Sequence, residues 1–221
     1  ASPPLGGRRI PWINFYAMTG LLFYLTILWF KIILPVVVII GVTVNPLLAL
    51  DEFRALFVTR WDFNSPARVQ TIVTNAKSGG FNVIFFQVRG IADAFYQSNY
   101  EPWSKDLTGT LGRNPGWDPL QEAVTRGHAA GLEVHAWINT LPAGNSSTPP
   151  PPTTPPHILY SHPDWLMANS QGVKMAPDVY GYVFVSPGIP AVQDHISNVV
   201  YDIASRYNVD GVHFDYIRYP D

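Results

Sequence analysis

The chain has 221 residues, a formal net charge of −2 and no cysteine. The absence of cysteine excludes disulfide bonds, a thiolate nucleophile, a cysteine-ligated zinc site and lipid anchoring through an N-terminal cysteine. The near-neutral charge, with no run of basic residues in the part that reads as globular, argues against a nucleic-acid partner. No sequence feature calls for a cofactor, so we expect none.

An apolar region dominates the N-terminal part of the chain. Arg8 and Arg9 precede residues 10–50, which one charge, Lys31, divides into two halves long enough to cross a bilayer of about 30 Å as helices. The simplest interpretation makes residues 32–44 the apolar core of an export signal. An uncleaved anchor and a buried helix of a soluble protein are the alternatives. Residues 1–50 are thus predicted to be a signal peptide or membrane anchor, which places the remainder outside the cytoplasm.

Strand and helix patterns alternate through the rest of the chain. Helices are predicted to begin at Pro66, Pro119 and Pro190, since proline is favoured in the first turn of a helix. Between them lie apolar segments typical of buried parallel strands, each ending in polar or aromatic residues: 55–61, 81–89, 132–139 and 207–221. This alternation predicts a parallel α/β fold, and the polar strand ends favour a barrel mouth over a doubly wound sheet.

The last of these strands carries the strongest functional signal. Alternation along a strand puts His213 and Asp215 on the face opposite Val212 and Phe214. A carboxylate beside a histidine at the end of a buried strand costs solvation energy, and in an α/β barrel this end carries the catalytic groups. We therefore predict that Asp215 is a catalytic carboxylate. The alternative is a structural Asp215 that caps the next turn or pairs with Arg218.

Other residues at the strand ends and in the loops suit a sugar-binding cleft. Aromatic faces stack on sugar rings, and amide or guanidinium groups bind hydroxyls. The loops carry further aromatics, including Tyr180 and Tyr182, of which half or more are expected to pack the loops. Asp62, Asp93, Glu101 and Asp106 are interpreted as capping or solvated. The predicted substrate-binding residues are Arg60, Trp61, Gln87, Arg89, Trp103, His135, Trp137, Asn139, His213 and Arg218.

Eight motifs occur in order along the chain: RALFVTRWDF (54–63), FQVRG (86–90), ADAFY (92–96), EPW (101–103), HAWINT (135–140), HPDW (162–165), SPGIP (186–190) and VDGVHFDYIRYP (209–220). Together they resemble a bacterial glycosyl-hydrolase-like family, the tenth of its series. The resemblance implies a (β/α)8 TIM-barrel catalytic domain and hydrolysis of glycosidic bonds in an extracellular or cell-envelope polysaccharide, with peptidoglycan glycan strands as one such substrate. One departure is Ile91, where a polar or small residue is expected.

The number of strands is small for such a barrel. An eight-unit barrel needs about 250 residues, whereas residues 53–221 contain four predicted strands. We interpret them as the N-terminal half of a barrel and expect the second carboxylate of the usual glycosidase pair to lie elsewhere. Residues 53–221 alone are expected to be inactive and poorly monomeric, because half a barrel leaves two open strand edges.

A proline-rich segment and two histidines leave alternatives open. Composition alone makes residues 148–157 an interdomain linker, but the barrel pattern resumes after them, so we predict one long loop over the active site. His157 and His162, with Asp164 nearby, raise the alternative of a metal-dependent hydrolase or deacetylase. A non-catalytic carbohydrate-binding barrel is the other alternative. The glycosidase interpretation needs no metal.

Overall fold

The computed structural model describes residues 52–220. The predicted signal or anchor, residues 1–50, lies outside this range. None of the helices within the described range is both long enough and apolar enough to span a bilayer. Nearly all described residues belong to one compact unit, Phe53–Asp221.

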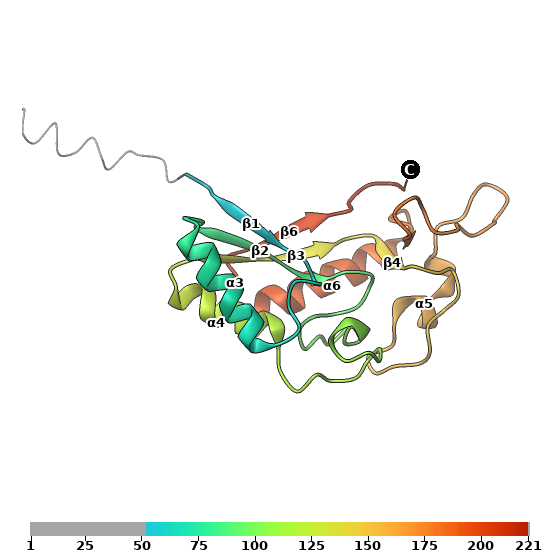
Figure 1. Ribbon diagram of the computed structural model, residues 1–221. Coiled ribbons are helices and arrows are strands. Elements are labelled where there is room, and N and C mark those ends of the chain that lie inside the picture. Colours follow the sequence, from blue (N-terminus) through green and yellow to red (C-terminus); the bar gives the residue numbers. More distant parts are fainter. Residues whose placement is uncertain (1–51, 221) are drawn as a thin grey trace, which may run out of the picture. The chain divides into compact units, whose positions relative to one another are not determined.

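Four parallel strands form the central sheet, and their spatial order follows the chain (Figure 1). They are β1 (Ala55–Val58), β2 (Val83–Arg89), β3 (Glu133–Asn139) and β6 (Gly211–Asp215). Two predicted strands were too long. Strand β1 ends before Arg60 and Trp61, which lie in a turn, and Tyr207 ends the preceding helix instead of beginning β6.

Three helices cover one face of this sheet (Figure 1). They are α3 (Pro66–Ser78), α4 (Pro119–Ala129) and α6 (Pro190–Arg206), and each begins at its predicted proline. The Ser65 and Asp118 side chains accept hydrogen bonds from the first turns of α3 and α4, which satisfies backbone N–H groups that have no partner within the helix. Because β–α units of one hand added in one direction put every helix on the same side, this arrangement differs from a doubly wound sheet.

The opposite face of the sheet carries a cluster of rings. Phe57 lies 4.7 Å from Phe85 and 5.4 Å from Trp137, measured between ring centroids, and Phe85 lies 4.7 Å from His213. Phe57 is 51% exposed, and none of the described helices packs on this cluster. Alternation along the strands thus puts His213 on the face opposite the helices, as predicted.

Long connections follow β2 and β3 at the C-terminal edge of the sheet (Figure 1). The first contains the short helix η3 (Lys105–Leu107). The second contains α5 (Ile158–Ser161), η4 (Pro163–Trp165) and an antiparallel pair, β4 (Pro142–Gly144) and β5 (Val183–Phe184), which share a second apolar core. The proline-rich residues 148–157 lie within this connection, so the prediction of a loop, as opposed to an interdomain linker, is confirmed.

Candidate active site

A buried ion pair lies where β2 ends. Arg89 and Glu101 are both fully buried, with Arg89 Nη2 2.8 Å from Glu101 Oε1 and Nε also donating to the carboxylate. Nη1 donates to backbone carbonyl oxygens of the segment after β3, including that of Asn139. His195 of α6 contacts Glu101 Oε1 from the other side at 3.1 Å. This cluster ties β2, β3 and α6 together at the edge of the sheet.

The electrostatics of the cluster favour an ionised Glu101. Burial raises the pKa of Glu101, but the Arg89 guanidinium and the hydrogen bonds from His195 and Arg89 outweigh burial and hold this pKa at about 2. A buried charge pair is stable only when its remaining donors and acceptors are satisfied. The carbonyl acceptors of Arg89 meet that condition, so the cluster is a structural support for the strand ends.

A line of amides runs across the strand ends beside this cluster. Gln87 Nε2 donates to Asn139 Oδ1 at 3.0 Å, and Gln87 Oε1 accepts the backbone N–H of Arg60 at 3.0 Å. Both amides are buried. Since Gln87 uses both ends of its amide within the protein, its main effect is to orient Asn139 and the turn that carries Arg60.

Asp215 is the last residue of β6 and pairs in register with Asn139 of β3. Its Oδ1 accepts the backbone N–H of Tyr216 at 2.7 Å and lies 3.8 Å from Arg218 Nη1. The side chain remains 31% exposed. Tyr216 has a positive φ of 50°, an uncommon conformation for a residue with a side chain. The chain thus turns sharply after Asp215 and leaves its carboxylate accessible at the strand end.

A cavity of about 600 Å³ adjoins these strand ends. Arg60 lines it, and its guanidinium carbon lies 4.2 Å above the ring of Trp61. Arg60 Nη2 donates to the Tyr182 hydroxyl at 3.1 Å. The Tyr182 ring in turn meets the Tyr216 ring edge-on, with 5.5 Å between centroids. Asp215 itself is not among the lining residues, but Tyr216 connects it to this wall.

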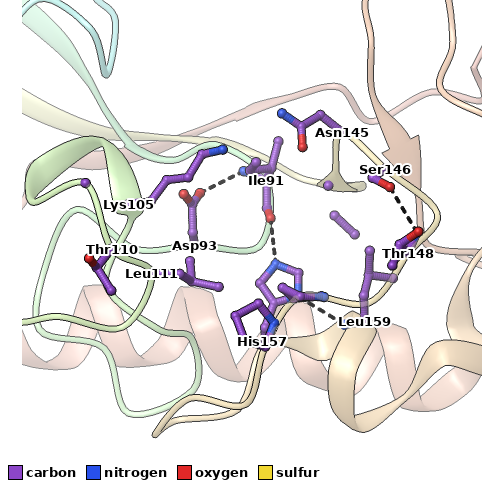
Figure 2. A pocket seen from close by; sticks show the side chains of 15 residues that line it. Ile91, Asp93, Lys105, Thr110, Leu111, Asn145, Ser146, Thr148, His157 and Leu159 are labelled. Carbon is purple, nitrogen blue, oxygen red and sulfur yellow. Dashed lines mark hydrogen bonds between the residues drawn. The ribbon is translucent and has the colours of Figure 1, made fainter.

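A second cavity of about 400 Å³ shares Ile91, Lys105 and Asn145 with the first (Figure 2). Ile91 donates its backbone N–H to Asp93 Oδ1 at 2.9 Å, and its carbonyl oxygen lies 3.1 Å from His157 Nε2. The proline-rich loop supplies part of the wall. The two cavities are therefore neighbours at the C-terminal edge of the sheet, and we refer to them together as the cleft.

Sequence comparison assigns the chain to a family. The family model described as "Glycosyl hydrolase-like 10" matches residues 52–221. The chain belongs to the glycosyl hydrolase-like 10 family. It is 34% identical over 150 residues to "Glycosyl hydrolase YngK" of Bacillus subtilis, covering 67% of this chain and 27% of that protein. It is 38% identical over 144 residues to "Glycosyl hydrolase DigH" of Escherichia coli K12, covering 62% and 30%. The chain therefore spans less than a third of each of these curated relatives.

Solved structures agree with the fold. A hypothetical protein from Ruminiclostridium thermocellum superposes with a TM-score of 0.55 at 16% identity, covering 75% of this chain and 78% of that one. The galactosidase domain of AgaSK, an alpha-galactosidase-sucrose kinase, gives a TM-score of 0.50 at 15% identity, covering 74% and 21%. At such identities the likeness concerns the fold alone.

In this family member, the structure brings most predicted site residues to one edge of the sheet. Arg60 and Trp61 line the larger cavity, Gln87 and Asn139 form the amide line, and Arg218 lies beside Asp215. Trp137 and His213 contact each other on the open face, and the buried Trp137 Nε1 has no hydrogen-bond partner in the part of the chain that the structure describes.

Three predicted substrate-binding residues are not available to a substrate at these strand ends. Arg89 is fully buried in its ion pair, so it supports the site without an exposed edge for a sugar. His135 shares the face of Asn139 but pairs in register with Gly211, the first residue of β6, which puts it at the opposite end of the strands from Asp215. Trp103 lines neither cavity of the cleft and is half-buried beside Ala94.

The interpretation of Glu101 as capping or solvated was wrong, because it is fully buried and doubly paired. The sequence feature that could have indicated its burial is the EPW motif, in which Glu101 directly precedes the apolar residues Pro102 and Trp103. Asp62 caps its turn as predicted, accepting from the Thr59 backbone N–H at 2.8 Å. Sequence reasoning missed Lys105 and Asn145, which line both cavities and which no pattern distinguishes from ordinary loop residues.

The two histidines of the metal alternative have other partners. His157 accepts from the Leu159 backbone N–H through Nδ1 and contacts the Ile91 carbonyl through Nε2. Burial lowers the pKa of His157, which favours the neutral ring. His162 stacks on Trp165, with 4.1 Å between centroids. Within residues 52–220, no group of three or more His, Asp or Glu side chains is arranged to hold a metal ion.

Proposed function

We propose that this protein is a glycoside hydrolase in which Asp215 is one of the reacting carboxylates. The observation that carries the proposal is the position of Asp215: it ends β6, stays accessible, and pairs in register with Asn139 of the amide line. The next residue, Tyr216, contacts Tyr182 in the wall of the larger cavity. Catalytic groups of α/β barrels lie at this end of the strands. An ionised carboxylate there acts as nucleophile or stabilises the positive charge of the oxocarbenium-like transition state.

The four parallel strands are, in this proposal, half of a (β/α)8 barrel. Sequential strand order, helices on one face and an open ring-bearing face support it, since the inner face of a barrel is filled by layers of side chains. Usual glycosidases need a second carboxylate, as general acid or base. We propose that this group belongs to the other half of the barrel.

The proposed substrate is an extracellular or cell-envelope polysaccharide, with peptidoglycan glycan strands as the leading example. Export supports this choice, and the apolar residues 10–50 behind Arg8 and Arg9 are the basis for proposing export with membrane attachment. Fractionation of cells that express the complete gene tests the proposed export. Recovery of the protein with an intact N-terminus in the cytoplasm would contradict it.

Release of new reducing ends tests the activity. Protein from the complete gene is incubated with purified peptidoglycan and with a panel of neutral and acidic polysaccharides, and reducing ends are counted over time. We expect a time-dependent increase with at least one of them. Sedimentation with a polysaccharide without any reducing-end release would instead favour the non-catalytic carbohydrate-binding barrel.

Replacement of Asp215 by asparagine tests its role. Asp215→Asn keeps the shape and removes the charge, so turnover on the best substrate is expected to fall by about 10³-fold or more. The matched control is Asp194→Asn, since Asp194 is exposed on α6. Circular dichroism and thermal unfolding should be unchanged in both variants. Near-normal turnover of Asp215→Asn would reassign this residue to a structural role.

A further inference from the structure

We propose that the larger cavity contains a subsite for a carboxylate-bearing sugar unit, with Arg60 as its principal ligand. This inference rests on the proposed function, because it specifies the chemistry of the glycan that the cleft binds. It concerns an acidic substituent on the sugar and not the bond that is cleaved.

The donors of Arg60 are the first observation. A guanidinium has five N–H donors, and within residues 52–220 only the bond from Nη2 to the Tyr182 hydroxyl uses one of them. Arg60 is 5% exposed, yet its buried Nε and Nη1 have no hydrogen-bond partner among these residues. Buried charged donors without partners are costly, so their retention in a cavity wall points to a ligand that accepts from them.

The surroundings of Arg60 hold its guanidinium in place. The Trp61 ring covers it at 4.2 Å, and a Cβ atom added to Gly90 would lie 2.5 Å from Nη1. The absence of a side chain at position 90 therefore makes room for the group. Nη1 lies against Gly90, whereas Nε lies on the side of Asp106, which lines the cavity. The edge formed by Nε and Nη2 is therefore the one for a ligand, and a planar carboxylate matches such an edge with two parallel hydrogen bonds.

Charge in the cavity favours an anion. The lining contains two cations, Arg60 and Lys105, and one carboxylate, Asp106. Asp106 Oδ2 lies 3.7 Å from Arg60 Nε, beyond hydrogen-bond distance, and the Asp106 side chain is 31% exposed, so water screens its effect. Lys105 is exposed and lines both cavities. A bound carboxylate would therefore meet a net positive wall.

The position of the subsite fits a glycan that also reaches Asp215. Tyr182 contacts Arg60 through its hydroxyl and Tyr216 through its ring, and Tyr216 directly follows Asp215. Exposed Trp61 and Tyr180 beside Arg60 offer faces for a sugar ring. The acidic sugar would thus lie beside the unit that is processed at Asp215.

Matched acidic and neutral saccharides test the inference with protein from the complete gene. One pair is trigalacturonic acid and its neutral methyl ester; here the acid carries its carboxylate directly on a ring carbon. The other pair is N-acetylglucosaminyl-N-acetylmuramic acid and the neutral N,N′-diacetylchitobiose; here the acid carries its carboxylate on an ether substituent. Binding is followed by NMR titration at low salt. In at least one pair the acid is expected to bind about tenfold more tightly, and the pair identifies the source of the carboxylate.

Three variants separate Arg60 from general charge. Arg60→Gln should abolish the preference for the acid and change the affinity for the neutral partner by less than about twofold. Lys105→Gln, at an exposed position, should reduce the preference by about two- to threefold. Arg113→Gln removes an exposed arginine that lines neither cavity of the cleft and should change nothing.

The outcomes distinguish this inference from the proposed function. Equal binding of acid and neutral partner, or a preference that survives Arg60→Gln, overturns the carboxylate subsite and leaves glycan binding intact. Equal losses in Arg60→Gln and Arg113→Gln overturn it in favour of unspecific attraction. Binding of no saccharide in either pair overturns the subsite and counts against the proposed function as well.

Discussion

Two arginines at neighbouring strand ends have opposite environments. Arg89 at the end of β2 is fully buried, pairs with Glu101 and donates to carbonyl oxygens of the next connection. Arg60, just after β1, is nearly as buried, but at the wall of a cavity its Nε and Nη1 have no hydrogen-bond partner among the described residues, and Asp106 lies 3.7 Å from Nε. In the sequence the two look alike, since both follow an apolar run.

The difference lies in what each guanidinium has to bind. Arg89 is saturated by the protein, so its charge holds secondary structure elements together. Arg60 is held by Trp61 and Gly90, neither of which accepts a hydrogen bond from it. A buried guanidinium whose N–H donors are paired within the protein supports the fold. A guanidinium that is packed in place with unpaired N–H donors can instead bind a ligand.

The largest expected effect concerns the saturated cluster. Glu101→Gln removes the counter-charge of Arg89 and should lower the free energy of unfolding by about 3–5 kcal/mol, because an uncompensated charge stays buried. Chemical denaturation measures this. Glu122→Gln is the matched control, since Glu122 pairs with Arg126 on the surface and should cost less than about 1 kcal/mol. Similar small losses in both variants would contradict the structural role of the cluster.

Lowering the pH should weaken the same cluster of Arg89, Glu101 and His195 and so reduce the free energy of unfolding. The pKa of Glu101 is about 2 in the folded protein, against an ordinary value of 4.5 for a glutamate exposed to water. A lowered folded pKa gives stability that is fully present above pH 4.5 and is lost as the pH falls toward 2. The wild type should therefore lose about 3 kcal/mol more than Glu101→Gln across this window. Unfolding curves of both proteins at several pH values test it, and parallel losses would argue against the pairing.

The smallest change in stability is expected at Gly90. The three atoms nearest to its added Cβ all belong to the Arg60 side chain, which can move, so Gly90→Ala should change the free energy of unfolding by less than about 1 kcal/mol. Displacement of the Arg60 guanidinium should nevertheless abolish the preference of the protein for acidic over neutral saccharides. In the double variant with Arg60→Gln, the effect of Gly90→Ala on binding should vanish. Additive binding losses would show that Gly90 acts independently of Arg60.

Local signals predicted much of the fold. The helix starts at Pro66, Pro119 and Pro190 are where the sequence indicated, because capping and proline effects depend on adjacent residues. The sequential parallel sheet followed from strand–helix alternation. Strand bounds were less accurate: β6 begins after Tyr207, which caps α6 and belongs to the core.

The site was harder to predict, since its contacts join distant residues. Alternation assigned His135 to the correct face but not to the correct end of the strand, and four residues along a strand span roughly 13 Å. Glu101 lies 12 residues from Arg89 and 94 from His195, so no local pattern reveals that it is paired. Whether an arginine is saturated depends on such partners, which sequence alone does not show.

A side-by-side measurement of Arg89→Gln and Arg60→Gln tests the contrast most directly. Each variant is assayed for its free energy of unfolding and for its preference between acidic and neutral saccharides. We predict that Arg89→Gln loses about 3–5 kcal/mol of stability. Arg60→Gln should keep its stability within about 1 kcal/mol and lose the preference for the acid. Equal destabilisation by both changes, with the acid preference of Arg60→Gln intact, would contradict the division between a supporting and a ligand-binding arginine.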